Sequence, residues 1–179
     1  MIEVLVTIVI VTIGLLGLAG LQARIQVAEL ESYQRVQALI LLQDMVDRLK
    51  ANRNQAVSYV STAGTGSTVT SASSGFQLDL YEWHNALLGS SETAGSAKLG
   101  AMIDARGCIT NPVAVMPYEF IVAVAWQGLT PTAVPTASTC GAGQYGSNDA
   151  LRRVVITRVV FSCLQNAAGA PTTCEATTP

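Results

Sequence analysis

The sequence is poor in the residues on which most enzyme chemistry depends. It has one histidine, His84, and charged side chains make up 12% of its 179 residues, against about 25% in an average soluble domain. The motifs GxSxG, SxxK, HExxH, GxGxxG and GxxxxGKS/T do not occur. A Ser/His/Asp triad would have to use His84, and the scattered carboxylates indicate no acid–base pair. We therefore expect no enzymatic activity and no cofactor.

Close-spaced cysteine pairs are also missing. All four cysteines lie in the C-terminal half without a CxxC pair, so the ligand spacing of a zinc site is not present. An even number of cysteines beyond a membrane anchor is typical of disulfides in an oxidising compartment. Three pairings are possible, and sequence proximity favours Cys108 with Cys140 and Cys163 with Cys174.

Positive charge is scarce as well, since the formal net charge is -2. The only basic cluster in the C-terminal part consists of Arg152, Arg153 and Arg158, which we expect to pair with local acids or to face solvent. Non-specific binding to nucleic acid needs several phosphate contacts, so direct contact with nucleic acid is not expected. Trp83 and Trp126 are expected to pack in the core.

What the sequence does contain is a long apolar run at its start. Residues 4–21 carry no charge, and their only polar side chains are Thr7 and Thr12. Eighteen helical residues span about 27 Å, close to the roughly 30 Å hydrocarbon core of a bilayer. No basic segment or small-residue cleavage site of a secretory signal occurs before Arg24. The run therefore predicts a membrane-spanning helix.

This helix is expected to continue well beyond the membrane. No proline or glycine occurs in residues 21–52. A helix of about 50 residues would be about 75 Å long, so its first half must project from a small domain. The second half is amphipathic, with Leu39, Leu42, Val46 and Leu49 on one face and Gln37, Asp44, Asp47 and Arg48 on the other.

The remaining residues predict a head of the α+β class. Two stretches rich in small residues, 61–75 and 87–100, read as surface loops. Alternating apolar residues predict strands in 101–109, 118–129 and 152–163, joined without a long helix, as in an antiparallel sheet. We expect the sheet to cover the apolar stripe of the helix. The expected organisation is a membrane and filament-core segment (1–23), an amphipathic segment (24–53) and a globular head (54–179).

The N-terminal residues resemble those of type IV pilins. The stretch IEVLV running into an apolar helix is typical of that family, and Glu3 falls on the glutamate that its members carry near their mature start. More narrowly, EVLVTIVIVTIGLLGLAGLQ and LQDMVDRLKANR are similar to the V-type minor pilin of type IV pili. The resemblance implies the type IV pilin fold, a long N-terminal helix on an antiparallel sheet.

The resemblance also implies a function. It indicates a minor pilin, held in the inner membrane, that primes pilus assembly with other minor pilins and lies at or near the tip beside the major pilin. Twitching motility, adhesion and DNA uptake would depend on that filament. Separate chains would supply the ATPase, the assembly platform and the prepilin peptidase, and the family's basic leader and methylated first residue precede the position matching Met1.

Two other functions fit the same pattern. The first is a pseudopilin of a type II secretion system, which shares the architecture. The second is a tip adhesin or DNA receptor that binds a ligand through residues 127–150.

Glu3 and three glycines are the candidate assembly residues. In the family, the matching glutamate is thought to meet the N-terminal amine of a neighbouring subunit and to set axial register. Alternatively, Glu3 lies among lipid headgroups at a helix N-terminus, where the helix dipole favours negative charge. Gly14, Gly17 and Gly20 would either loosen the helix or pack closely against neighbouring helices.

Overall fold

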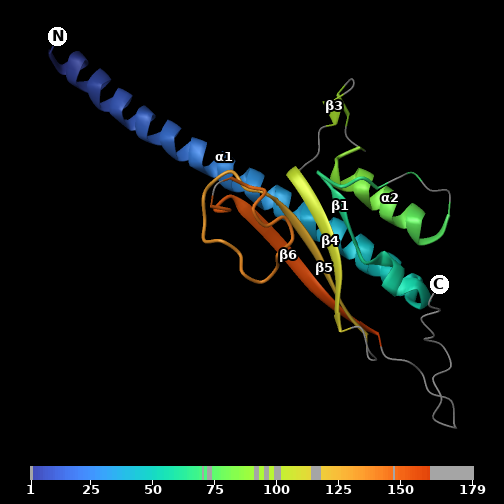
Figure 1. Cartoon of the computed structure of the whole chain (residues 1–179). Helices are drawn as coiled ribbons and strands as arrows, with labels where there is room; N and C mark the ends of the chain where they lie inside the picture. Colours follow the sequence, from blue (N-terminus) through green and yellow to red (C-terminus); the bar gives the residue numbers. More distant parts are fainter. Residues whose placement is uncertain are drawn as a thin grey trace, which may run out of the picture.

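The computed structural model describes residues 2–69, 71, 74–90, 93–94, 97–98, 102–113, 118–146 and 148–161. A long helix lies beneath a four-stranded antiparallel sheet, and its N-terminal half projects from the head (Figure 1). The predicted α+β class and type IV pilin fold are confirmed. The elements are α1 (Ile2–Ala51), a 3-10 helix (Arg53–Tyr59), β1 (Ser61–Gly64), α2 (Gly75–Leu87), β2 (Thr93–Ala94), β3 (Ala97–Lys98), β4 (Ile103–Val113), β5 (Tyr118–Gln127) and β6 (Arg152–Phe161).

The helix α1 runs unbroken for 50 residues, as its lack of internal proline predicts. Only its second half is covered by the head, through Gln34, Ala38, Leu42, Met45, Val46 and Leu49. The prediction that Leu39 belongs to the face covered by the sheet is wrong, because this residue is 47% exposed. Spacings of 3 and 4 allow two neighbouring stripes on a helix, and the head covers the stripe that contains Ala38 and Met45.

The sheet has the strand order β1-β4-β5-β6, with all three pairings antiparallel. Along β5 the side chains of Phe120, Val122, Val124 and Trp126 are buried against α1, as their alternation predicts. The expected loop at 61–75 is partly wrong, because its first four residues pair with β4. The expected loop at 87–100 contains the short hairpin β2–β3.

Trp83 of α2 fixes this helix against both α1 and the sheet. Its side chain is fully buried, and its Nε1–H donates a hydrogen bond of 2.9 Å to the carbonyl of Leu41. Opposite the ring lies Gly107 of β4, where an added Cβ would come within 2.2 Å of the indole. The absence of a side chain at position 107 therefore lets α2 approach the sheet.

The outer edge of β1 is blocked at two of its backbone groups. The hydroxyl of Ser67 donates to the carbonyl of Thr62 at 2.7 Å, and the amide of Gly64 donates to Nδ1 of His84 at 3.0 Å. The amide of Thr65 donates to the carbonyl of Ala105 on β4. Because alternate residues of an antiparallel strand bond to its neighbour, the carbonyl of Thr62 and the amide of Gly64 point away from β4. His84 thus has a structural role at the sheet edge.

The contact between Gly107 and Trp83 can be tested by adding one methyl group. We expect Gly107→Ala to lower the free energy of unfolding of the full chain by about 1–3 kcal/mol, because overpacking forces the indole to shift. Val160→Ala, at a site 60% exposed on the same sheet, should change it by less than about 0.5 kcal/mol. Urea unfolding followed by tryptophan fluorescence measures both. Equal stability of the two variants would contradict this packing.

Candidate assembly surfaces

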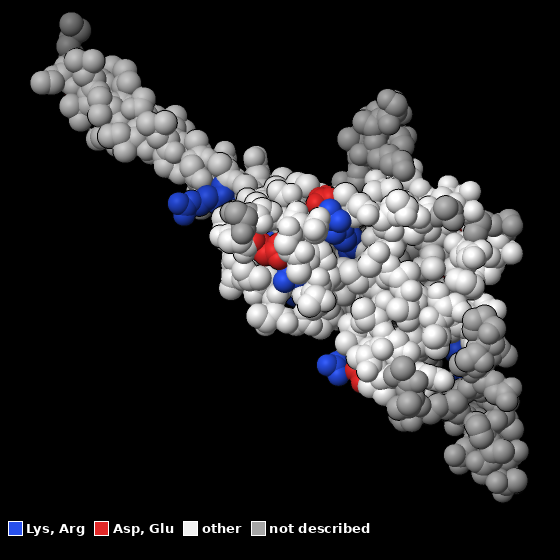
Figure 2. Space-filling view, in the orientation of Figure 1, with Lys and Arg blue, Asp and Glu red and all other residues white. Residues whose placement is uncertain are grey.

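The projecting half of α1 is an apolar rod without cover from the head. Its most hydrophobic 18-residue window has a mean hydropathy of 2.7 and none of its residues buried, so it can cross a membrane by length and composition. Most of the rod carries neither blue nor red atoms in the space-filling view (Figure 2). Such a surface requires lipid or other apolar helices around it.

The predicted assembly residues all lie on this rod. Glu3 is exposed in the first turn of α1, where its charge is favourable for the helix dipole. Nothing lies within 4 Å of a Cβ added at Gly14, Gly17 or Gly20. The three glycines therefore leave an open surface on a helix that is continuous through all of them.

Glu31 fastens α1 to the head at the point where the helix leaves it. Its Oε1 accepts hydrogen bonds from the amides of Leu129 and Thr130 at 3.1 and 3.0 Å and from the Thr130 hydroxyl at 2.9 Å. The guanidinium of Arg153 on β6 lies 3.3 Å from the same oxygen. Burial raises the pKa of Glu31, but the hydrogen bonds from Thr130 and Leu129 and the charge of Arg153 outweigh it, so the pKa lies below its ordinary value.

A second polar cluster fastens the other end of α1 to α2. Arg48 forms ion pairs with Asp44 on its own helix and with Asp79 and Glu82 on α2, at 3.0, 3.0 and 2.6 Å. Tyr59 donates a short hydrogen bond to Asp79. Burial raises the pKa of this tyrosine, and the carboxylate raises it further. The two clusters hold α1 to the head at points 17 residues apart, at Glu31 and Arg48.

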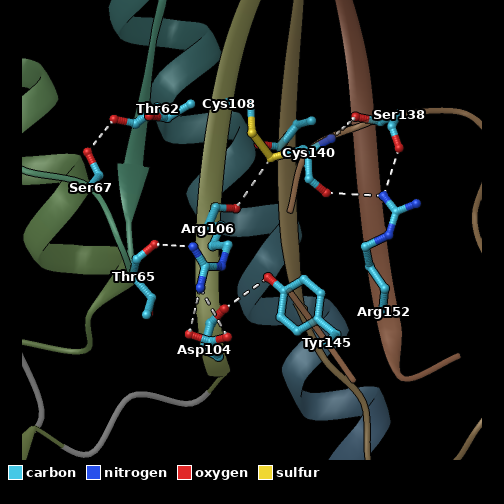
Figure 3. The surroundings of a disulfide bond; sticks show 11 residues. Thr62, Thr65, Ser67, Asp104, Arg106, Cys108, Ser138, Cys140, Tyr145 and Arg152 are labelled. Carbon is cyan, nitrogen blue, oxygen red and sulfur yellow. Dashed lines mark hydrogen bonds and ion pairs between the residues drawn. A yellow bond between two sulfur atoms is a disulfide. The ribbon is translucent and has the colours of Figure 1, made fainter. Parts of the chain in front are cut away.

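The sheet face opposite the helices is covered by the loop of residues 128–151. A disulfide joins Cys140 in this loop to Cys108 on β4, the pairing that sequence proximity favours (Figure 3). The loop can lie close because β5 presents the small side chains of Ala123 and Ala125, which are buried together with Cys140 and Tyr145. The hydroxyl of Tyr145 donates a hydrogen bond of 2.9 Å to the carbonyl of Asp104.

Arg152 holds the same loop from β6. Only 4% of its surface is exposed. It donates to the carbonyls of Pro135 and Ser138 at 2.7 Å and of Cys140 at 3.1 Å. Its Nε lies 3.2 Å from the carboxylate of Asp149. A buried arginine that bonds to backbone carbonyls fixes a loop whose described residues form no helix or strand.

The three arginines of the predicted basic cluster are therefore all engaged. Arg152 and Arg153 hold the loop and α1, and Arg158 forms an ion pair of 2.7 Å with Glu119 on β5. Charged atoms of both signs occur in small groups on the face shown in Figure 2. Trp83 and Trp126 are buried, as predicted. This arrangement gives the described residues no basic stripe for a phosphate backbone.

Two adjoining cavities of about 410 and 470 Å³ lie beside the disulfide. Both are lined by Thr62, Cys108, Thr139 and Gly141, and Arg106 lines the smaller one. The guanidinium of Arg106 already bonds to the Thr65 carbonyl and lies 3.4 Å from the carboxylate of Asp104. No group of three or more His, Cys, Asp or Glu side chains suited to a metal ion occurs in the part of the chain that the structure describes.

The sequence predicts the pairing of Cys108 with Cys140, but it does not predict the contacts of Glu31 and Arg48 or the burial of Arg152. The partners of Glu31 are 98–122 residues away in the sequence, and the partners of Arg48 on α2 are 31–34 residues away. No local sequence pattern predicts contacts over such separations. The remaining predicted pair, Cys163 and Cys174, lies outside the described residues.

An antiparallel sheet packed on the second half of a long helix, whose apolar first half is bare, is the arrangement that the resemblance to type IV pilins predicts. Residues 20–77, about a third of the chain, match the model of the Tt1218-like family, described as type IV pilin Tt1218. Neither the comparison with curated proteins nor that with solved structures gives a match. The match supports a structural role as a pilin-like subunit, and the apolar helix is long and apolar enough to cross a membrane.

The fastening at Glu31 predicts a pH dependence. Because folding lowers the pKa of Glu31 from its ordinary 4.5, its contribution is present above that value and is lost as the pH falls through the lower, folded value. We expect Glu31→Gln to speed hydrogen exchange at the amides of Leu129 and Thr130 about tenfold at pH 7, as the loss of about 1.4 kcal/mol requires.

Hydrogen exchange of the full chain in detergent micelles checks this prediction. Both proteins are compared at pH 7 and at pH 3, with rates corrected for intrinsic exchange. The difference should shrink at pH 3, and Glu3→Gln, at an exposed site on the same helix far from the head, should leave both amides unaffected. A difference that does not depend on pH would show that the charge of Glu31 is irrelevant.

The disulfide predicts a stability effect that is separate from the helix contacts. Its cysteines are 32 residues apart, and closing a loop of that length stabilises a domain by about 3–4 kcal/mol in the chain-entropy model. We expect the double variant Cys108→Ala/Cys140→Ala to lose about this much free energy of unfolding, measured in urea. Hydrogen exchange at the α1 amides of residues 38–49 should become faster only to the extent that global unfolding does. Unchanged stability would mean that Arg152 alone secures the loop.

Proposed function

We propose that this chain is a minor pilin of a type IV pilus, which primes assembly together with other minor pilins and is located at or near the tip. The bare rod of residues 2–21 carries the proposal. Its hydropathy and full exposure suit a segment that passes from the lipid bilayer to the apolar centre of a filament. In both environments the rod is covered without any change in the head.

Glu3 is the residue of the rod that would determine the axial position of the subunit in the filament. A carboxylate at the centre of a bilayer costs at least about 2.5 kcal/mol, and an unpaired charge in an apolar bundle is similarly costly. We propose that Glu3 meets the N-terminal amine of the adjacent subunit. This contact would stabilise one axial position over all others.

The buried contacts of the head support a structural role. Described acids and bases of the head are tied to one another, to backbone groups or to α1, in contacts made by Arg48, Arg152, Arg153 and Arg158. The loop of residues 128–151 is fixed at several points. A pseudopilin of a type II secretion system would share these features. The position of the gene among pilus or secretion genes separates the two.

Replacing the carboxylate tests the proposal. We expect Glu3→Gln in the full chain to reduce its incorporation into sheared pili at least tenfold, since about 1.4 kcal/mol suffices for that factor. The membrane-bound amount should stay unchanged because the rod still inserts. Thr7→Val, on the same exposed rod, is the matched control and should incorporate normally. Immunoblots of sheared and membrane fractions measure both, and normal incorporation of Glu3→Gln would refute the register role.

A further inference from the structure

The second half of α1 has an apolar stripe on the face that points away from the head. The side chains of Ile25, Tyr33, Val36 and Ile40 are 47–55% exposed, and together with Glu29 they follow spacings of 4, 4, 3 and 4. Buried residues follow the same spacings, at Gln34, Ala38, Leu42, Met45 and Leu49. The two series are displaced by nine residues, or about two and a half turns, so they lie on opposite faces.

Glu29 lies in the middle of this outward stripe. It is exposed and makes no hydrogen bond or ion pair with any residue that the structure describes. Once another subunit covers the stripe, a carboxylate there would be buried among apolar groups, which is costly unless a cation meets it. The stripe therefore requires a partner surface that carries a positive charge.

Such a surface exists where α1 leaves the head. A cavity of about 300 Å³ at this junction, the junction pocket, is lined by Ala28, Glu31, Ser32, Arg35, Trp126 and Arg153. Glu31 and Arg153 are paired with each other. Arg35 is exposed and has no hydrogen-bond or ion-pair partner within the described ranges. The junction pocket thus has one unbalanced positive charge beside small side chains that leave room for a carboxylate.

We propose that the junction pocket of one copy receives Glu29 from the outward stripe of a second copy, and that Glu29 forms an ion pair with Arg35. This inference rests on the proposed pilin function in one respect, because a shared membrane makes the two helices parallel. Arg35 lies six residues beyond Glu29, so the copies are displaced along the helix axis by about 9 Å. The contact joins two different surfaces, and repeating it yields an open helical array.

Arg24 is the other cation of α1 that lacks a partner among the described residues, and it serves as the competing position. It lies five residues before Glu29 on the projecting part of the helix and does not line the junction pocket. Pairing with Arg24 would displace the copies by about 7.5 Å in the opposite direction. Only pairing with Arg35 places Glu29 in a pocket that is also lined by residues of the head. Cross-linking distinguishes the two pairings, because each joins Glu29 to a different position of α1.

The test uses zero-length cross-linking of full-length chains in phosphatidylethanolamine–phosphatidylglycerol vesicles. Arg35→Lys keeps the charge and supplies an amine that carbodiimide couples to a carboxylate in contact with it. Mixing ¹⁵N-labelled and unlabelled chains identifies links between copies by mass. We expect mixed-isotope peptides joining residues 29 and 35 to exceed, at least fivefold, those joining 29 and 24 in Arg24→Lys. Equal yields, or none between copies, would overturn the inference.

Charge exchange provides the second measurement. Energy transfer between labelled copies measures their apparent affinity. We expect this affinity to fall about tenfold in Glu29→Arg or Arg35→Glu. The double variant should regain the affinity, because it restores the ion pair with the charges exchanged. Apolar association alone would give no recovery, which would overturn the ion pair. If pairing fails while Glu3→Gln still blocks incorporation, the pilin role stands without this contact. Pairing without any effect of Glu3→Gln would instead remove the register role.

Discussion

The packing of one helix face against the sheet is the contact on which the rest of the structure depends. Leu42, Met45 and Leu49 are buried in the same core as Phe120 and Val122 of β5. A helix of 50 residues is about 75 Å long, and its buried residues all lie from residue 34 onward. Coverage of one half leaves the other half bare, so the same packing that stabilises the head creates the apolar rod.

Polar groups then fix the position and the angle of the helix, which apolar packing alone specifies loosely. Glu31 and Arg48 hold α1 at two points, to the loop after β5 and to α2. Arg152 and the disulfide do the same for the loop on the opposite face of the sheet. Most of the described charges of the head form such internal contacts, whereas Glu3, Arg24, Glu29 and Arg35 of α1 have no hydrogen-bond or ion-pair partner among the described residues.

The sequence predicts those parts of the structure that local periodicity determines. The continuation of α1 to residue 51 follows from the stretch without proline or glycine that begins at residue 21, and the buried face of β5 follows from strict alternation. Strand β1 was missed because STAG has little β-propensity and pairs only through its neighbour β4. The wrong assignment of Leu39, and the missed roles of Glu31 and Arg152, have one cause. Each depends on which distant segment lies opposite, and no short-range pattern contains that information.

The blocked edge of β1 has a consequence for the proposed membrane-anchored state, in which subunits are concentrated in two dimensions. Unpaired strands at high local density recruit strands from other chains and lead to cross-β stacking. Ser67 and His84 occupy the outward groups of Thr62 and Gly64, so this edge offers no template. Subunits held at high density by their apolar helices, as the proposed function requires, would therefore not join irreversibly along this side of the sheet.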